Sequence, residues 1–113
     1  MVRSWEGQVV DNVHFQFDTI LHQEMRANIM KYLASSDTLA VRTIKDKLEV
    51  TDGNLATHLH TLEQVGYIEI QKTFENRRPR TIVSITQKGE DAYKEYLQQL
   101  KAFVDEYEKH KED

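Results

Sequence analysis

The 113-residue chain contains no cysteine. It can therefore form neither disulfides nor thiolate metal sites, on which a secreted protein of this size usually depends. The sequence also lacks an apolar stretch of about 18 residues, and its first 17 residues lack the basic start and unbroken apolar run of a signal peptide. We therefore expect a cytoplasmic protein that does not span a membrane, built as one compact domain with terminal extensions.

Charge is distributed unevenly along a chain that is acidic overall. The net charge is -4 and the pI is about 5.7, whereas a pI above about 9 is the simple expectation for a nucleic-acid-binding domain. Residues 86 to 113 contain five Lys against eight Asp and Glu, but residues 70 to 85 contain Lys72, Arg77, Arg78 and Arg80 against Glu75 alone. This segregation leaves a local positive surface that can contact phosphates, so the acidic total argues only weakly against DNA binding.

Apolar residues at helical spacing predict three helices in the first two thirds of the chain. The first has Asp18 as its N-cap and ends at Ser35 or Ser36. A short extended stretch at residues 38 to 40 separates it from a second helix of about ten residues. We expect the third helix to have Thr51 as its N-cap and to run to Gly66, which suits a left-handed C-cap.

The next segment predicts a two-stranded hairpin. Residues 67 to 74 place apolar side chains on one side, and residues 81 to 85 are β-branched at four of five positions. The polar residues 75 to 80 between them predict a basic turn stiffened by Pro79.

A last helix, capped by Thr86, has aromatic and leucine residues at the spacing of a coiled-coil seam. The seam consists of Tyr93, Tyr96, Leu100, Phe103 and Tyr107. One helix cannot bury such a seam alone, so we expect a homodimer that forms through these residues. Residues 1 to 17, in which Val13, Phe15 and Phe17 alternate as in an extended segment, are expected to pack on the body or on the partner subunit.

Five short motifs accompany this order of elements, namely TDGNL at 51–55, HL at 58–59, LEQVGYI at 62–68, RPRT at 78–81 and TQKG at 86–89. The order of elements is that of a winged helix-turn-helix, and with these motifs the chain resembles the winged-helix regulators related to the MarR and ArsR groups. The resemblance implies a dimeric prokaryotic DNA-binding regulator that is not an enzyme, with the third helix as reader and the hairpin as wing. The expected fold is mainly α with a small β-hairpin (α+β), divided into an arm (1–17), a DNA-binding domain (18–86) and a long C-terminal dimerisation helix (87–113).

The third helix has two contrasting faces when it is drawn at 100° per residue. Leu55, Leu59 and Leu62 form a stripe that we expect to face the core. The other side carries small or hydrogen-bonding residues, namely Gly53, Asn54, Thr57, His60, Thr61 and Gln64. Such residues suit a helix that lies close to base edges in the major groove, although an ordinary solvated face is the alternative.

Further DNA contacts are expected around this helix and on the wing. Gly53 would let a phosphate approach the free N–H groups of the first turn, although simple turn chemistry explains it equally well. His58, at the edge of the apolar stripe, either packs and bonds the backbone or contacts a phosphate. The basic wing residues either contact the backbone or minor groove of DNA or remain solvated. The predicted DNA-binding set is Thr51, Gly53, Asn54, Thr57, His58, His60, Thr61, Lys72, Arg77, Arg78 and Arg80.

Two other functions are compatible with parts of the sequence. A winged helix can serve as a protein-docking module, in which case salt-dependent DNA binding would be weak or absent. A metal or small-molecule sensor has little support, because His58 and His60 point about 200° apart on one helix and cannot share a metal ion within a subunit. The last helix offers only Asp105, Glu106, Glu108 and His110. We therefore expect no catalytic residue, no cofactor and no metal site.

Overall fold

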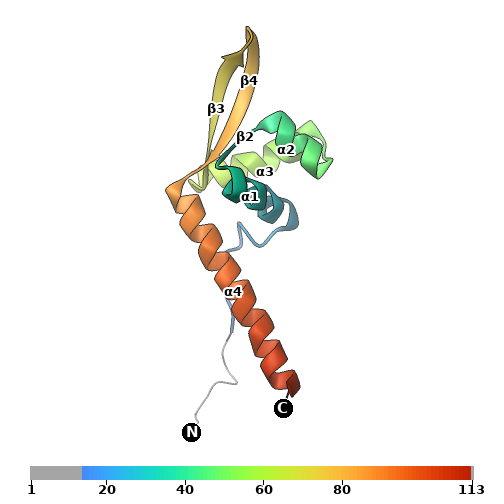
Figure 1. Ribbon diagram of the computed structural model, residues 1–113, viewed down its shortest axis with the longest axis vertical. Helices are drawn as coiled ribbons and strands as arrows, with labels where there is room; N and C mark the ends of the chain where they lie inside the picture. Colours follow the sequence, from blue (N-terminus) through green and yellow to red (C-terminus); the bar gives the residue numbers. More distant parts are fainter. Residues whose placement is uncertain (1–13, 113) are drawn as a thin grey trace.

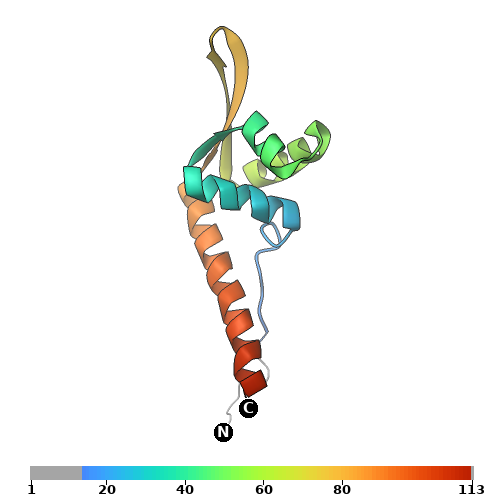
Figure 2. The ribbon, with the colours of Figure 1, turned by 45° about the vertical axis from the view of Figure 1, so that its right-hand side comes forward.

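The computed structural model describes residues 14–112 and confirms a winged helix-turn-helix with a long C-terminal helix (Figure 1). In chain order the elements are α1 (Glu24–Ser36), β2 (Thr38–Ala40), α2 (Val41–Leu48), α3 (Asp52–Gln64), β3 (Ile68–Glu75), β4 (Arg78–Ile85) and α4 (Gln87–Glu112). The molecule is elongated, at 67 × 24 × 22 Å, because the β3–β4 hairpin and α4 project in opposite directions from the body that α1, α2 and α3 form (Figures 1 and 2).

The first helix begins later than the sequence predicts. The predicted N-cap is Asp18, but α1 begins at Glu24, and its N-cap is Gln23, whose side chain accepts a hydrogen bond from a backbone N–H of the first turn. Asp18 instead caps a separate turn, because its Oδ1 accepts from the N–H groups two and three residues further on. The apolar periodicity continues through this turn, so the pattern alone could not separate it from the helix. The predicted end at Ser36 is confirmed.

The turn between α2 and α3 follows the prediction. Glu49 ends α2 in the left-handed conformation, and the Thr51 hydroxyl accepts a hydrogen bond of 3.2 Å from the Asn54 N–H at the start of α3. The predicted N-cap is therefore confirmed. Helix α3 ends at Gln64, and Gly66, with φ +84°, turns the chain into β3.

The three strands form an antiparallel sheet in the order β2-β4-β3. Strand β2 pairs with residues 82 to 84 only, whereas β3 pairs with the whole of β4. The outer part of the hairpin therefore has no third strand and projects from the body as the wing (Figure 1).

The wing turn is much shorter than the predicted polar turn of residues 75 to 80. Asn76 and Arg77 alone form it, with φ angles of 53° and 68°, and Glu75 pairs with Arg78 across it. Two successive positive φ values are characteristic of the type I′ turns that match the twist of a hairpin, and Asn suits that conformation. Pro79 lies within β4 and does not stiffen the turn, so that prediction was wrong.

The hydrophobic core lies between the first three helices and the inner face of the sheet. Leu55, Leu59 and Leu62 are all buried, which confirms the predicted apolar stripe of α3. The remaining buried core residues are Leu21, Ile29, Met30, Leu33, Ile44, Ile68, Val83 and Tyr96. Because this stripe is held in the core, the opposite face of α3 is held toward solvent.

The start of α4 is fitted closely to the turn that follows α3. The Thr86 hydroxyl donates to the Gly66 carbonyl (2.6 Å) and accepts from the Gly89 N–H (3.0 Å), which confirms the predicted cap. Gly89 is buried, and a Cβ atom there would lie 2.1 Å from the Tyr67 carbonyl oxygen. Only glycine allows so close a contact with Tyr67. From this junction α4 extends away from the body over 26 residues (Figure 2).

Candidate nucleic-acid interface

The solvent face of α3 brings most of the predicted base-reading residues together. Asn54, Thr57 and His60 are exposed, and Thr61 is half-buried. The Thr57 hydroxyl donates to the Gly53 carbonyl (3.0 Å), and the Thr61 hydroxyl donates to the Thr57 carbonyl (3.1 Å). Their protons are used within the helix, so these two hydroxyl oxygens are presented to solvent as hydrogen-bond acceptors.

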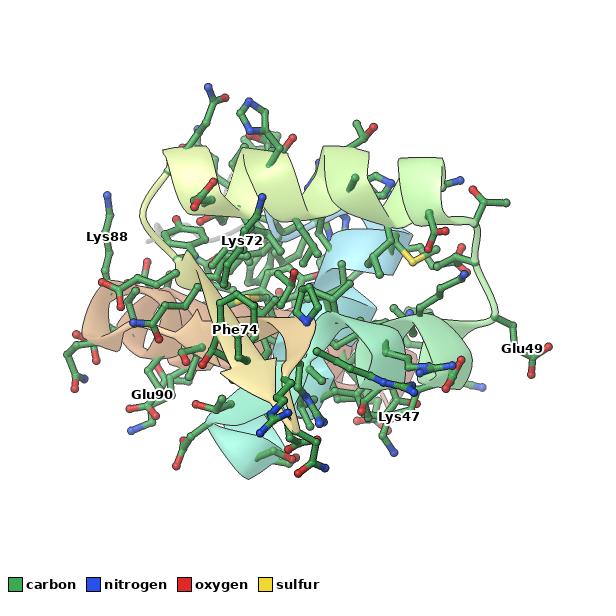
Figure 3. The ribbon with its side chains drawn as sticks, turned by 90° about the horizontal axis from the view of Figure 1, so that it is seen from above. Lys47, Glu49, Lys72, Phe74, Lys88 and Glu90 are labelled. Atoms are coloured by element: carbon green, nitrogen blue, oxygen red, sulfur yellow. The ribbon has the colours of Figure 1, made fainter. Side chains whose placement is uncertain are left out.

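The wing places basic side chains beside this face. Lys72, Arg77 and Arg78 are exposed, and in the view along the wing Lys72 points to the side on which α3 lies (Figure 3). Arg80 is the exception within the predicted set, because it forms an ion pair with Glu75 on the neighbouring strand. Its positive charge is therefore partly compensated, which the sequence did not indicate.

A groove of about 930 Å³ separates α2 from the wing. Its lining includes Arg42 and Lys45 of α2, opposite Arg78 of the wing. Lys45 forms an ion pair of 2.9 Å with Asp52 at the start of α3. Arg42 lies in the first turn of α2 and is exposed, so it adds a positive side chain near the wing that the sequence prediction did not include.

Neither a metal centre nor a membrane span is found in the part of the chain that the structure describes. Residues 14–112 contain no group of three or more His, Asp or Glu side chains placed to hold a metal ion. Within the same residues, no helix has the length and apolar content needed to cross a membrane.

Comparison with known proteins identifies this arrangement. Residues 25–104 match the model of the winged helix DNA-binding domain family. An uncharacterised protein of Methanocaldococcus jannaschii is 36% identical over 81 residues, which cover 72% of this chain and 88% of the relative. The structure of a transcriptional regulator homologue from Pyrococcus horikoshii superposes with a TM-score of 0.76 at 34% identity, over 80% of this chain and 89% of the other.

The chain belongs to the winged helix DNA-binding domain family. This domain is similar to those of transcriptional regulators, and the family is non-enzymatic. The fold is also that of MarR, whose crystal structure gives a TM-score of 0.67 at 23% identity over 77% of this chain and 63% of MarR. The predicted resemblance to MarR-like regulators is confirmed.

His58 of this winged helix has a partner that the sequence did not suggest. It is half-buried, and its Nδ1 lies 3.1 Å from Nη1 of Arg26 on α1. A guanidinium group only donates, so Nδ1 accepts and the proton of the neutral ring lies on Nε2. Burial, and then the Arg26 charge, lower the pKa of His58 below its usual 6.5. Within residues 14–112 the ring bonds a side chain, and no hydrogen bond from it to the backbone is found. Its predicted phosphate contact stays a prediction.

Acidification is expected to destabilise the wild-type winged helix more than the variant His58→Asn. The unfolded chain binds a proton at His58 near pH 6.5, but the folded state binds it only at lower pH. The contribution of neutral His58 to the free energy of unfolding is therefore complete above pH 6.5 and is lost as the pH falls through the lowered pKa. Asn offers an acceptor oxygen to Arg26 and does not titrate. Thermal unfolding from pH 7.5 to pH 5 measures the difference in midpoint between the two proteins. Both proteins contain the other histidines, so this difference reports on His58. Parallel curves would contradict the assignment.

The coiled-coil seam of α4 is divided between two environments. Tyr96 is buried in the core of its own chain, and its hydroxyl lies 2.9 Å from Nδ1 of His22. Further along, Phe103 and Tyr107 are 52% and 64% exposed. Exposed apolar residues on the same side of the helix extend this part of the seam and include Leu97 and Val104.

The described end of the N-terminal arm lies against α4. The rings of Phe15 and Phe17 meet the Phe103 ring edge to face, with centroids 5.5 and 5.6 Å away. Phe15 and Phe17 therefore pack on the body of their own chain, which is one of the two alternatives expected for the arm. The predictions for residues 1 to 13 fall outside the described residues. Phe103 therefore marks the position where arm and helix combine their apolar surfaces.

Proposed function

We propose that this winged helix is a homodimeric transcriptional regulator that binds duplex DNA sequence-specifically. Helix α3 enters the major groove, and the wing lies on the backbone or in the minor groove. The observation that carries the proposal is the polar solvent face of α3 beside a projecting basic hairpin, in a chain related to a transcriptional regulator homologue. In a prokaryotic cell such a regulator works in the cytoplasm, which holds the DNA.

Two features support the role of α3 as the reading helix. The apolar stripe of α3 is buried in the core, so the helix can present only its opposite face to DNA. That face carries short side chains, which allow the helix axis to approach the base edges in a groove about 12 Å wide. Residues 18–86 then form the DNA-binding unit, and Asn54, Thr57, His60 and Thr61 are the residues that select the sequence.

Replacing Asn54 with Ala is expected to weaken binding to a selected operator by about 1–3 kcal/mol and to leave binding to random duplex nearly unchanged. An amide side chain can form two hydrogen bonds to adenine, and this pairing carries sequence information. Titrations of a duplex selected by the wild-type protein and of a random duplex measure the ratio of the two affinities. Gln64→Ala removes a similar amide from the last turn of α3 and should preserve the ratio. An equal loss of affinity for both duplexes in Asn54→Ala would mean that Asn54 contacts the DNA backbone and not the bases.

Replacing Arg78 with Ala is expected to flatten the slope of log affinity against log salt by about 1.8 in a dimer with two wings. Each arginine that neutralises one phosphate contributes about 0.9, and the loss should appear on selected and random duplexes alike. Arg80→Ala should change the slope less, because Glu75 already pairs with Arg80. Lys109→Ala, in the last turn of α4, serves as the charge control.

The same salt titrations separate DNA binding from the protein-docking function. If the wing meets an acidic protein instead of DNA, the slopes of Arg77→Ala, Arg78→Ala and Arg80→Ala will all equal that of the wild type. That result would remove the wing from the DNA interface.

Homodimerisation through α4 and the arm completes the proposal. The exposed half of the seam is a contiguous set of large apolar side chains on a helix that extends away from the body, where a second copy can approach it (Figure 2). Pairing of two seams buries them in the manner of a coiled coil and places two copies of α3 on one duplex. In this arrangement residues 87–113 form the dimerisation helix, and Tyr93, Tyr96 and Leu100 support its base.

A further inference from the structure

The wing carries an apolar pair that the DNA contacts proposed above do not use. Phe74 is 73% exposed and is the most exposed large hydrophobic residue in the described part of the chain. It lies two positions before the turn formed by Asn76 and Arg77, directly opposite Pro79 on β4. The two apolar side chains therefore lie close to the tip of the hairpin.

The register joins Phe74 and Pro79 into one surface. Glu75 and Arg78 flank a two-residue turn, so the pair next to them is a non-hydrogen-bonded pair, in which opposite side chains lie closest, with Cβ atoms about 5 Å apart. The Pro79 nitrogen, which has no hydrogen, faces the other edge of β4, where β2 pairs only with residues 82 to 84. Proline is therefore tolerated here without loss of a sheet hydrogen bond.

The pair lies on the face of the wing that continues the inner face of the sheet. Side chains alternate along a strand, so Phe74 shares its face with Lys72, Ile70 and Ile68. Ile68 is buried in the core, and Lys72 points toward the side of α3 (Figure 3). Phe74 and Pro79 thus extend the same face beyond the body, next to a basic side chain.

We propose that Phe74 and Pro79 form a wedge that enters the minor groove of the bound duplex, partly unstacks one base step and kinks the DNA. The inference rests on the proposed function. Lys72 lies on the face of the pair, Arg77 lies in the turn, and alternation along the strand places Arg78 on the opposite face. When the tip enters the groove, these cations can contact phosphates on both walls, and the apolar pair near the tip is carried toward the base edges. Phe and Pro are among the side chains with which minor-groove proteins unstack base steps and bend duplexes by about 20–90°.

A wedge of this kind adds specificity at positions that α3 does not touch. Pyrimidine–purine steps unstack at the lowest energetic cost, so the wedge favours sites that place such a step under each wing. The alternative occupant is an acidic protein, which the basic residues also fit. The position of the pair on the α3 side of the wing favours DNA, because α3 is the proposed reading element.

The test uses the full chain and a duplex of about 30 base pairs, selected by the wild-type protein from a random pool and labelled at its ends with a donor and an acceptor dye. Wild-type protein should raise the energy transfer between the dyes. Phe74→Ala should lose most of this bending and bind about tenfold more weakly, with an unchanged salt slope because no charge is removed. Phe74→Leu should retain most of the bending, and Thr73→Ala, on the opposite face, should behave as wild type.

The outcomes separate the wedge from the function on which it rests. If wild-type protein binds the duplex without bending it, or if Phe74→Ala bends and binds it as wild type does, the wedge is overturned while DNA binding stands, and an acidic protein partner becomes the better occupant of the pair. If wild-type protein binds no duplex, the proposed function fails and the wedge fails with it. Circular dichroism of each variant confirms that the fold is intact.

Discussion

Replacing Gly89 with Ala is expected to destabilise the protein by about 3 kcal/mol, the upper end of the usual range for an overpacked site. The new Cβ would lie 2.1 Å from the carbonyl oxygen and 2.9 Å from the carbonyl carbon of Tyr67. These are backbone atoms, and the Tyr67 carbonyl also accepts a hydrogen bond from the Thr86 N–H, so neither side can move without breaking the junction at the start of α4. Thermal unfolding at fixed protein concentration should show a midpoint lower by roughly 12–24 °C.

Gly53→Ala is the matched control for this substitution. Gly53 also lies near the start of a helix, but nothing lies within 4 Å of a Cβ atom built there. Alanine has the higher helix propensity, so Gly53→Ala should leave the stability unchanged or raise it by up to about 1 kcal/mol. An unfolding midpoint for Gly89→Ala equal to that of wild type would show that α4 does not begin against Tyr67 in solution.

Gly89 also shows why part of the fold could not be predicted from the sequence. The helices, the caps at Thr51 and Thr86 and the buried stripe of α3 follow from local periodicity and capping chemistry, which the sequence states directly. The reason for a glycine in the first turn of α4 is a contact with a residue 22 positions earlier, which no local pattern encodes. The start of α1 was wrongly predicted at Asp18 for a different reason, because the local apolar pattern continues outside the helix.

The prediction of a polar turn over residues 75 to 80 was wrong, because polar residues alone do not distinguish a loop from an exposed strand. Residues 75 to 80 are polar and contain a proline, which usually marks a turn, but Arg78, Pro79 and Arg80 continue β4 beyond the body. A strand that is exposed on both faces needs no alternation of apolar residues, so its pattern resembles that of a loop. Asn76 was the informative residue, since two-residue hairpin turns favour asparagine at positive φ.

The exposure of the candidate DNA-binding residues could be predicted where they are neighbours in sequence, as on α3. The face of α3 follows from the position of its apolar stripe, whereas the partners of His58 and Arg80 come from other elements. His58 meets Arg26 of α1 only because both helices pack on one core. The exposed Phe74 was not recognised, because an apolar residue in an alternating strand is normally assigned to the core.

Replacing Phe103 with Glu is expected to convert the protein to a monomer at micromolar concentration and to weaken binding to a selected operator by at least about a hundredfold. Phe103 lies where the arm meets the exposed half of the seam, and a carboxylate there would be desolvated and would face its own copy across the two-fold axis. A monomer carries one α3 and loses the gain in effective concentration that the second half-site provides. Analytical ultracentrifugation measures the assembly, and operator titration measures its consequence.

Ala102→Glu separates the effect of the seam from the effect of added charge. Ala102 is exposed and lies about 160° around the helix from Leu100 and about 100° from Phe103, away from the seam. This variant gains the same charge one residue away, so it should remain a dimer and bind the operator as wild type does. Phe103→Leu, which keeps the site apolar, should also dimerise. If Phe103→Glu sediments as a dimer with wild-type operator affinity, the two copies do not meet along this half of α4, and the exposed seam must be covered in another way.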